Sequence, residues 1–260
     1  MAADTSIAEP VSQVPVTVVI ATRNEEANIA ACIDSVRWAD EIIVADQGSS
    51  DETQAHAENA GAMVLSVVEA PTIGAGRNLA IGRARNHWIL VVDADERGTT
   101  DLERAVRSTI ANPAAVAYRV PRTNHFMGGE VRHGGWESDR PVRLFDSALR
   151  YNDSRVHEHV ITNTEPATLT SPLLHYPYAS MEIYFEKFVR YSRWWAEDQS
   201  RRGRRASVAA VIFKPPARFI SMYIFRLGFL DGPRGAALAA LAAASVCAKY
   251  VRLWALECES

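Results

Sequence analysis

Two aspartates stand one residue apart at the end of an apolar run. Asp93-Ala-Asp95 directly follows Trp88-Ile-Leu-Val-Val92. At the end of a strand, two carboxylates with this spacing can point round a tight turn toward one metal ion. Mg²⁺ and Mn²⁺ prefer hard oxygen ligands of this kind and often complete their coordination with substrate phosphates. The alternative is a solvated acidic turn in which Asp95 caps a helix.

A third carboxylate, Asp46, ends the apolar run Ile42-Ile-Val-Ala45. A carboxylate in that position can accept a hydrogen bond from a base N–H or from a ribose hydroxyl. It can equally be a turn-forming aspartate before Gly48. The sequence alone leaves both interpretations open.

These residues lie in a region where strands and helices alternate. Strands are predicted for residues 16–21, 41–46, 62–66 and 88–92. Four helices are predicted between and after these strands. The first has Ile29, Ile33 and Val36 at helical spacing, and the second begins after a cap at Ser49 or Ser50. The third covers Gly74 to Arg85, and the fourth begins after a cap at Thr99 or Thr100 and ends at about Ile110. This alternation is typical of an α/β fold with a mostly parallel sheet covered on both faces, whose ligands bind beyond the carboxyl ends of the strands. The first strand is followed by no Gly-x-Gly-x-x-Gly, and the chain has no P-loop motif, so dinucleotide dehydrogenases and P-loop NTPases are poor fits.

The pattern changes after Pro113. Shorter, mixed strands are predicted for residues 118–121, 141–145 and 156–162, and the chain turns helical from Ser180. Arg201-Arg-Gly-Arg-Arg205 is expected to end the first helix, Lys214-Pro-Pro216 to interrupt the apolar stretch that follows, and a last helix to run from about Pro233 to Leu256. The expected organisation is a flexible leader (1–15), two halves of one domain (16–112 and 113–179) and a helical C-terminal extension (180–260).

Composition narrows the class of protein. The 260 residues are 48% hydrophobic and 23% charged, which is ordinary for a globular protein and excludes a disordered or low-complexity chain. Residues 1–180 carry 15 Lys and Arg against 24 Asp and Glu, and residues 181–260 carry 13 against 7. The acidic body argues against nucleic-acid binding.

The three scattered cysteines suit a reducing cytosol. The start of the chain does not read as a signal peptide, and the charge-free stretch Gly235–Ala248 is short, so no transmembrane helix is expected.

Four linked motifs resemble the family 2 glycosyltransferases of the GT-A fold. They are Val18-Val-Ile-Ala-Thr-Arg-Asn-Glu-Glu26, Ile43-Val-Ala-Asp-Gln-Gly-Ser-Ser-Asp-Glu-Thr53, Gly76-Arg-Asn-Leu-Ala80 and Leu90-Val-Val-Asp-Ala-Asp-Glu96. Later stretches, including Gly135 to Phe145, Val156-His-Glu158 and Phe229-Leu-Asp-Gly-Pro-Arg-Gly235, resemble the subgroup that adds a sugar to the inner core of lipopolysaccharide. The resemblance implies a nucleotide-diphospho-sugar transferase fold with a Rossmann-like sheet and a C-terminal helical extension. It also implies that residues 16–112 form the nucleotide-sugar-binding half of the domain and residues 113–179 the acceptor and catalytic half.

The resemblance also implies a role for each matching residue. The turn with Thr22, Arg23 and Glu25 is expected to cradle the base and ribose of a nucleotide sugar, with Asp46 accepting from the base imide. Arg77 is expected near the base or diphosphate, Asp93 by the ribose and Arg143 by the diphosphate. Asp95, with help from His157, is expected to hold a divalent cation, Mg²⁺ or Mn²⁺, that bridges the diphosphate. Arg143 as an ordinary strand salt bridge and His157 as a structural or acceptor-holding residue remain alternatives.

An inverting transfer needs a base that takes the proton of the acceptor hydroxyl. Related enzymes place an acidic residue before the strand that here begins at Arg140-Pro-Val-Arg, and the candidates are Asp139 and Glu137. Asp139 is the preferred one because it immediately precedes that strand. Members of the family often have Glu-Asp here, whereas this chain has Glu-Ser-Asp, so the choice between the two stays open.

The basic, aromatic tail has two interpretations. It is either a helical cover packed by its own aromatic side chains, or a platform that contacts the cytoplasmic face of the inner membrane through basic and aromatic residues. The same cations could instead bind a phosphorylated sugar acceptor. The resulting hypothesis is an inverting, metal-dependent hexosyltransferase that uses a UDP-sugar and a saccharide or glycolipid acceptor of the lipopolysaccharide core. The rivals are transfer to a polyprenyl phosphate and a non-catalytic nucleotide-sugar-binding assembly protein.

Overall fold

The computed structural model describes residues 14–136, 139–154, 158–178 and 180–258. The chain divides into two compact units, one formed by residues 1–121 and 140–173 and the other by residues 122–139 and 174–260. This division differs from the boundaries expected at residues 112 and 179. Residues 122–139 therefore group with the C-terminal helices, and no change of composition along the chain indicates this.

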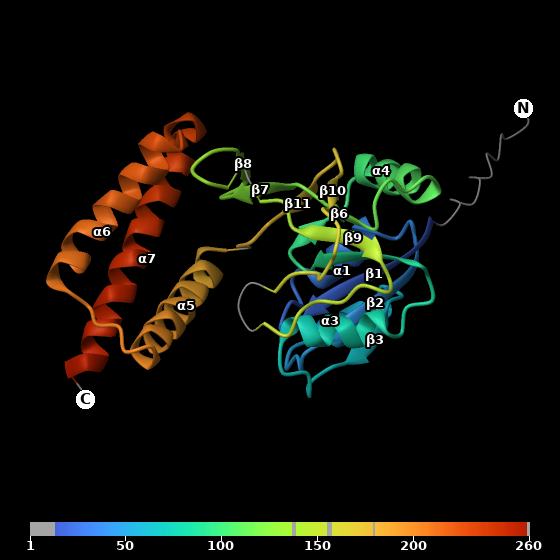
Figure 1. Ribbon diagram of the computed structural model, residues 1–260, viewed down its shortest axis with the longest axis horizontal. Helices are drawn as coiled ribbons and strands as arrows, with labels where there is room; N and C mark the ends of the chain where they lie inside the picture. The colour runs from blue at the N-terminus through green and yellow to red at the C-terminus, as the bar shows by residue number, and fades with distance from the viewer. Residues whose placement is uncertain (1–13, 137–138, 155–157, 179, 259–260) are drawn as a thin grey trace, which may run out of the picture. The chain divides into compact units, whose positions relative to one another are not determined.

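The first unit is built on a seven-stranded sheet with the order β10-β6-β9-β4-β1-β2-β3. Its strands are β1 (Val14–Thr22), β2 (Ala39–Asp46), β3 (Met63–Ser66), β4 (Trp88–Asp93), β6 (Ala117–Arg119), β9 (Val142–Asp146) and β10 (Ala167–Thr168), and the two-residue β5 (Glu96–Arg97) follows β4. β1 pairs in parallel with β2 and β4, and β2 with β3, whereas β9 runs antiparallel to β4 and β6. The predicted mostly parallel α/β sheet is confirmed (Figure 1).

Helices cover both faces of this sheet. They are α1 (Ile29–Ser35), α2 (Thr53–Asn59), α3 (Ile73–Ile81) and α4 (Thr100–Ala111). Residues alternate along β1, so that Val18 packs with α1 and α4 in one core cluster and Val19 packs with α3 in the other. Apolar strands with both faces buried account for the uninterrupted β-branched run that the sequence shows here.

Three local predictions need correction. Neither Ser49 nor Ser50 caps α2, whose N-cap is Glu52, because the Ser49 hydroxyl is bound to Asp46 instead. Helix α3 ends at Ile81 rather than Arg85. The strand expected over 156–162 is absent from its described part, 158–162, where Val160 makes only an isolated bridge with Tyr151. The predicted cap at Thr99 is confirmed, since its side chain accepts from the Leu102 N–H.

The second unit combines a small sheet with three long helices. Its elements are β7 (Arg122–Phe126), β8 (Gly129–Val131), β11 (Leu173–His175, whose first residue belongs to the first unit), α5 (Met181–Arg201), α6 (Val208–Ile220), a π-helical turn (Ser221–Phe225), a 3-10 turn (Gly228–Asp231) and α7 (Gly232–Cys258). Ser180 caps α5, and both α5 and α6 pack against α7. The predicted C-terminal helical extension is confirmed.

Helix α6 runs through Pro215 and Pro216, where the sequence predicted an interruption. Proline removes one backbone hydrogen bond and normally breaks a helix. Here Val211, Pro215 and Phe219 recur every four residues as the half-buried positions of a helix that packs against α7. Packing of this stripe offsets the lost hydrogen bonds.

The C-terminal helices are longer and more apolar than the sequence argument assumed. The most apolar 18-residue stretches of Val208–Phe225 and Gly228–Cys258 have mean hydropathies of 1.3 and 1.5, and only 11% and 17% of these stretches are buried in the protein. By length and composition both could cross a membrane. The expectation rested on the charge-free stretch 235–248, whereas α7 continues through Lys249 and Arg252. Contrary to that expectation, α7 has the length that a spanning helix needs.

Candidate active site

The carboxyl ends of the parallel strands bring the predicted polar residues to one edge of the first unit's sheet. In the strand register Thr22 lies opposite Asp46, and Asp46 lies opposite Ser66. On the other side of β1, Ala21 lies opposite Asp93. Residues from three separate motifs therefore share one edge, as the alternation of strands and helices predicted.

Asp46 organises the turn that follows β2. Its side chain is fully buried, and one carboxylate oxygen accepts from the backbone N–H groups of Gly48 and Ser49, both at 3.0 Å, and from the Gln54 amide at 2.7 Å. The other oxygen accepts from the Ser49 hydroxyl at 2.5 Å. Burial raises the pKa of Asp46, but the hydrogen bonds from Ser49, Gln54 and Gly48 outweigh it, so the pKa lies below the usual value of 3.8. Of the two interpretations left open, the structure shows the turn-forming one, and a direct contact with a base stays a prediction.

The turns after β1 and β2 are held together by hydrogen bonds between them. Asn24 adopts a left-handed backbone with φ 55°. Its N–H donates to the Ser49 hydroxyl at 2.9 Å, and its side-chain oxygen accepts from the Ser50 N–H at 2.8 Å. The Glu25 N–H donates to the Thr53 hydroxyl at 2.8 Å. Hydrogen bonds between polar groups of the two turns thus fix both turns. Glu25 takes part in them through its backbone N–H.

A pocket of about 460 Å³ opens at this edge of the sheet. It is lined by Arg23, Gln47, Val68, Ala70, Pro71, Thr72 and Ile73. Arg23 is exposed, whereas the Thr22 side chain is buried, and its hydroxyl has no partner among the described residues. Arg23 was predicted as a site residue, whereas Gln47 and Val68 were not. The strand-end rule could have found both, because Gln47 directly follows β2 and Val68 lies two residues after β3.

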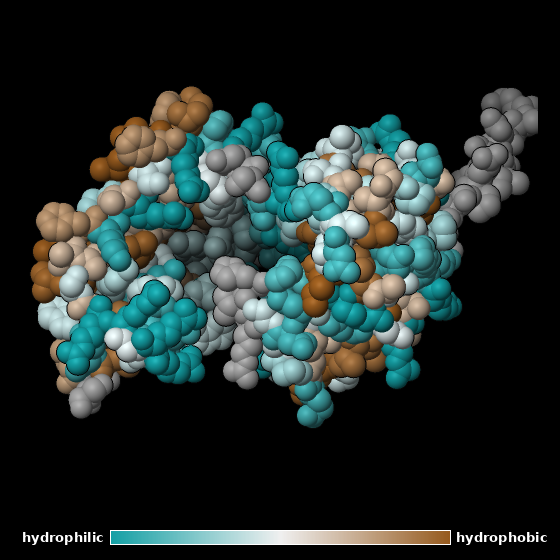
Figure 2. All heavy atoms as spheres, viewed as in Figure 1, coloured by the Kyte–Doolittle hydropathy of each residue, from teal (hydrophilic) through white to brown (hydrophobic). Residues whose placement is uncertain are grey.

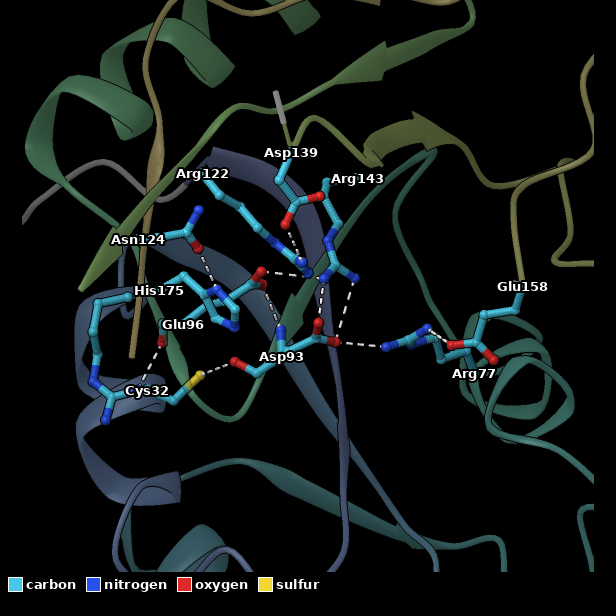
Figure 3. A network of polar contacts seen from close by, with 11 residues as sticks. Cys32, Arg77, Asp93, Glu96, Arg122, Asn124, Asp139, Arg143, Glu158 and His175 are labelled. Carbon is cyan, nitrogen blue, oxygen red and sulfur yellow. Dashed lines mark hydrogen bonds and ion pairs between the residues drawn. The ribbon is translucent and has the colours of Figure 1, made fainter. Parts of the chain in front are cut away.

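Asp93 is the centre of a network of ion pairs rather than an open carboxylate (Figure 3). Arg77 of α3 binds Asp93 at 2.5 Å and also binds Glu158. Arg143 of β9 binds both oxygens of Asp93 and reaches Glu96 at 3.1 Å. Glu96 in turn accepts from the Asp93 N–H at 2.8 Å. The two arginines therefore tie together α3, β4, β9 and the segment around Glu158.

The network is buried, and its charges stabilise one another. The side chains of Arg77 and Arg143 are 8% and 4% exposed, and Glu96 is fully buried. Burial lowers the pKa of Arg143, but Asp93 and Glu96 outweigh this and raise it well above its usual value. The same balance, with Asp93 as the main partner, raises the pKa of Arg77. For Arg143 the structure thus shows the strand salt bridge that the sequence held open, and diphosphate contacts of either arginine stay predictions.

Asp95 lies in the turn between β4 and β5 and is half-buried. Both oxygens of Asp93 bind arginine. A cation held by Asp95 stays a prediction. The described residues contain no group of three or more His, Cys, Asp or Glu side chains that could hold a metal ion by themselves. His157, the other predicted ligand, lies outside the described residues. A single carboxylate still fits Mg²⁺ or Mn²⁺ when diphosphate oxygens and water supply the remaining ligands.

Asp139 belongs to the second unit, where Arg122 holds it. The Arg122 guanidinium binds the Asp139 carboxylate at 2.8 Å, and the Arg122 N–H donates to the Asp139 carbonyl at 3.1 Å. The Asp139 side chain remains 43% exposed. Its carboxylate is thus oriented and accessible, which a proton acceptor requires. Glu137, the alternative base, lies outside the part of the chain that is described.

Comparison with known proteins decides the family. The model of "Glycosyl transferase family 2" matches residues 17–167, which include the strand-end turns and the ion-pair network. This chain belongs to glycosyltransferase family 2.

Relatives of this family 2 glycosyltransferase extend over most of the chain. It is 29% identical over 255 residues to the lipopolysaccharide core biosynthesis glycosyltransferase LpsC of Rhizobium meliloti (strain 1021), covering 91% of this chain and 93% of that protein. It is 26% identical to an uncharacterized glycosyltransferase of Rickettsia typhi (strain ATCC VR-144 / Wilmington), covering 82% and 77%. A solved glucosyl-3-phosphoglycerate synthase from Mycobacterium tuberculosis, in complex with Mn²⁺, UDP and glucosyl-3-phosphoglycerate, matches at 25% identity and a TM-score of 0.37, over 42% of this chain and 44% of that one.

Proposed function

We propose that this chain transfers a hexose from a UDP-sugar to a saccharide or glycolipid acceptor of the lipopolysaccharide core, with inversion at the anomeric carbon. The observation that carries the proposal is the strand register, which brings the turns after β1 and β2 to one pocket. The acceptor class comes from the relative LpsC, which matches over nearly the whole of both chains.

The donor binds at the pocket of the first unit. Arg23 at its wall offers guanidinium donors for a phosphate or a base carbonyl, and Gln47 offers an amide for the base edge. Asp46 supports donor binding indirectly, because its four hydrogen bonds fix the turn that carries Gln47. The pocket is therefore preorganised before a nucleotide arrives.

Asp95 holds the divalent cation together with diphosphate oxygens. When bound, such a cation neutralises the charge that grows on the leaving diphosphate. The network of Asp93, Arg77 and Arg143 keeps the end of β4 rigid, so that the neighbouring Asp95 stays in place. Asp93 is thus a positioning residue in this proposal, and its carboxylate is used by the two arginines.

Asp139 takes the proton of the acceptor hydroxyl as the oxygen attacks the anomeric carbon opposite the diphosphate. One bond forms to the acceptor oxygen, one breaks to the diphosphate oxygen, and the proton moves to an oxygen of the Asp139 carboxylate. A single displacement of this kind converts an α-linked donor into a β-glycoside. Arg122 keeps the carboxylate oriented for the transfer.

The C-terminal helices support contact with the cytoplasmic face of the inner membrane. Helix α6 and the turn after it expose a set of large apolar side chains: Val208, Ile212, Phe213, Ile220, Ile224 and Phe225. Helices that combine such residues with Lys and Arg bind at the boundary between headgroups and acyl chains. A lipid-anchored acceptor would be met at that surface.

The test is a transfer assay with UDP-sugars, lipopolysaccharide core acceptor and Mn²⁺ or Mg²⁺, with the product read by NMR. We expect a β-glycoside and a UDP-specific rise in melting temperature that ADP and GDP do not give. An α product from an α donor would rule out the single displacement. The assay is repeated with a radiolabelled donor and both acceptor classes. Label recovered only in the polyprenyl phosphate fraction would support that rival acceptor. Tight UDP binding without turnover, unchanged in Asp139→Asn, would make the chain a binding protein.

A further inference from the structure

The second unit contains a pocket of about 650 Å³ that the proposed sugar transfer does not use. It lies where the end of α5, the segment before α6, the first turns of α6 and the second half of α7 meet. The residues that line it are Trp195, Gln199, Arg204, Arg205, Ser207, Ala209, Ala210, Phe213, Lys214, Tyr250 and Leu253.

Positive charge dominates this pocket. Arg204, Arg205 and Lys214 line it, and none of its lining residues is Asp or Glu. Arg204 donates to the Gln199 side-chain oxygen at 2.9 Å, so its guanidinium is oriented at the wall. Lys214 donates to the Tyr250 hydroxyl and lies 4.4 Å from the centre of that ring. Three cations without an acidic partner in the lining favour an anionic ligand.

Two acids lie near the pocket without lining it. One oxygen of Glu257 accepts from the Ala206 N–H at 2.5 Å, and Asp198 pairs with Arg202 at 3.1 Å. Ser207 caps α6 and accepts from the Ala210 N–H at 3.1 Å, so the positive end of the α6 dipole also faces this region. The helix end adds to a charge that the three side chains already provide.

The pocket also continues into an apolar surface. Trp195 and Leu253 belong to its wall, and Phe213 belongs both to the wall and to the exposed face of α6. Phe213, Ile212 and Val208 are 68%, 56% and 62% exposed. Figure 2 shows hydrophobic residues along the edge of the helical unit where α6 lies. A ligand that joins a phosphate to hydrocarbon chains matches both parts, whereas a soluble phosphate matches only the first.

We propose that the pocket lined by Arg204, Arg205 and Lys214 binds the phosphate headgroup of one anionic phospholipid, whose acyl chains lie along the exposed apolar residues of α6. This inference deepens the membrane contact in the proposed function and rests on it, but it is independent of sugar transfer. The site makes membrane association depend on headgroup charge as well as on apolar insertion. It also ties α5, α6 and α7 to one lipid molecule.

The test is binding of the full chain to vesicles of phosphatidylcholine alone and of phosphatidylcholine with phosphatidylglycerol, which is no sugar acceptor in the proposed reaction. The variant Arg204→Gln/Arg205→Gln/Lys214→Gln removes the pocket charges. We expect it to lose roughly a hundredfold of the affinity for anionic vesicles, since each of the three basic residues contributes about 1 kcal/mol at such a surface. Binding to phosphatidylcholine vesicles should change little.

A matched variant, Arg190→Gln/Arg193→Gln/Arg201→Gln, removes the same charge from exposed positions on α5 outside the pocket. It should keep most of the anionic preference. An equal loss in both triple variants overturns the site in favour of a diffuse charge effect. Unchanged anionic preference in the pocket variant also overturns it. A rise in melting temperature with inorganic phosphate as large as that with phosphatidylglycerol would assign the pocket to a soluble phosphate and overturn the lipid.

The same measurements separate this inference from the proposed function. If the wild-type chain binds neither kind of vesicle, both the lipid site and the membrane contact fail, while the transfer assay still decides the sugar chemistry. If the wild type binds both kinds equally well, the membrane contact stands and the phosphate site fails.

Discussion

Arg143 binds Asp93 through both of its terminal nitrogens, joining strand β9 to the end of β4 inside the protein. The Arg143 side chain is 4% exposed and also binds Glu96, which is fully buried. A buried ion pair adds little to stability compared with apolar packing, but removing one partner leaves the other charges uncompensated. The pair is therefore a point where a single substitution has a large effect.

Replacing Arg143 by methionine should lower the free energy of unfolding by about 3–5 kcal/mol, because Asp93 and Glu96 lose their shared cation. Urea denaturation followed by fluorescence measures the change. The control is Arg104→Met, which breaks an exposed pair with Asp101, whose side chains are 72% and 70% exposed. That variant should lose less than about 1 kcal/mol. Equal losses in the two variants would contradict the role given to Arg143.

Asp46 should make the first unit sensitive to acid. Its pKa in the folded protein lies below 3.8, because hydrogen bonds from Ser49, Gln54 and Gly48 outweigh burial. A lowered pKa gives stability that is present above the unfolded pKa and is lost as the pH falls through the folded pKa. The stability difference between wild type and Asp46→Asn should therefore be largest near neutral pH and shrink below about pH 4. Gln54→Ala, which removes one donor, should give a smaller difference. A difference that is constant with pH would contradict the hydrogen-bond account.

Asp139→Asn should lower kcat by about 10²- to 10⁴-fold and leave the KM for the donor nearly unchanged, because it removes only the proton acceptor. Initial rates of transfer at several donor concentrations measure both constants. Glu130→Gln, in the neighbouring β8, serves as a control and should keep full activity. Near-normal kcat in Asp139→Asn would reassign the base to Glu137, and Glu137→Gln would then carry the loss.

Asp95→Asn should weaken the cation that supports donor binding. The Mn²⁺ concentration needed for a UDP-dependent rise in melting temperature should increase at least about tenfold, since even outer-shell partners of a metal change its affinity by that much. Adding EDTA to the wild type should abolish the UDP-dependent shift. Asp101→Asn, an exposed carboxylate in the first turn of α4, is the matched control. An identical Mn²⁺ requirement in Asp95→Asn and wild type would remove Asp95 from the site.

Gly235→Ala should destabilise the second unit, although alanine favours helices over glycine by about 1 kcal/mol. A Cβ at Gly235 would overlap the carbonyl oxygen of Gly228, where the 3-10 turn meets α7. Thermal unfolding should show a loss of about 1–3 kcal/mol, typical of overpacking. Ala240→Ser, at an exposed position of the same helix, should stay within about 0.5 kcal/mol of wild type. A stabilised Gly235→Ala would show that the close approach is not required.

The sequence by itself determined the order of strands and helices in the first half of the chain and the residues at the strand ends. Val18 and Val19 pack on opposite faces of the sheet. They belong to an uninterrupted apolar run, which is typical of a strand buried on both faces. Because parallel strands share one carboxyl edge, the placement of Asp46 and Asp93 at that edge followed from local pattern alone.

Only the tertiary structure decided what each of those carboxylates does. Asp46 is saturated by its own turn, and Asp93 is bound by Arg77 from α3 and Arg143 from β9, which lie 16 and 50 residues away in sequence. Ion pairs between segments that are distant along the chain leave no periodic signal, because they depend on how elements pack. The same reason explains why residues 122–139 group with the C-terminal helices and why three cations line one pocket there.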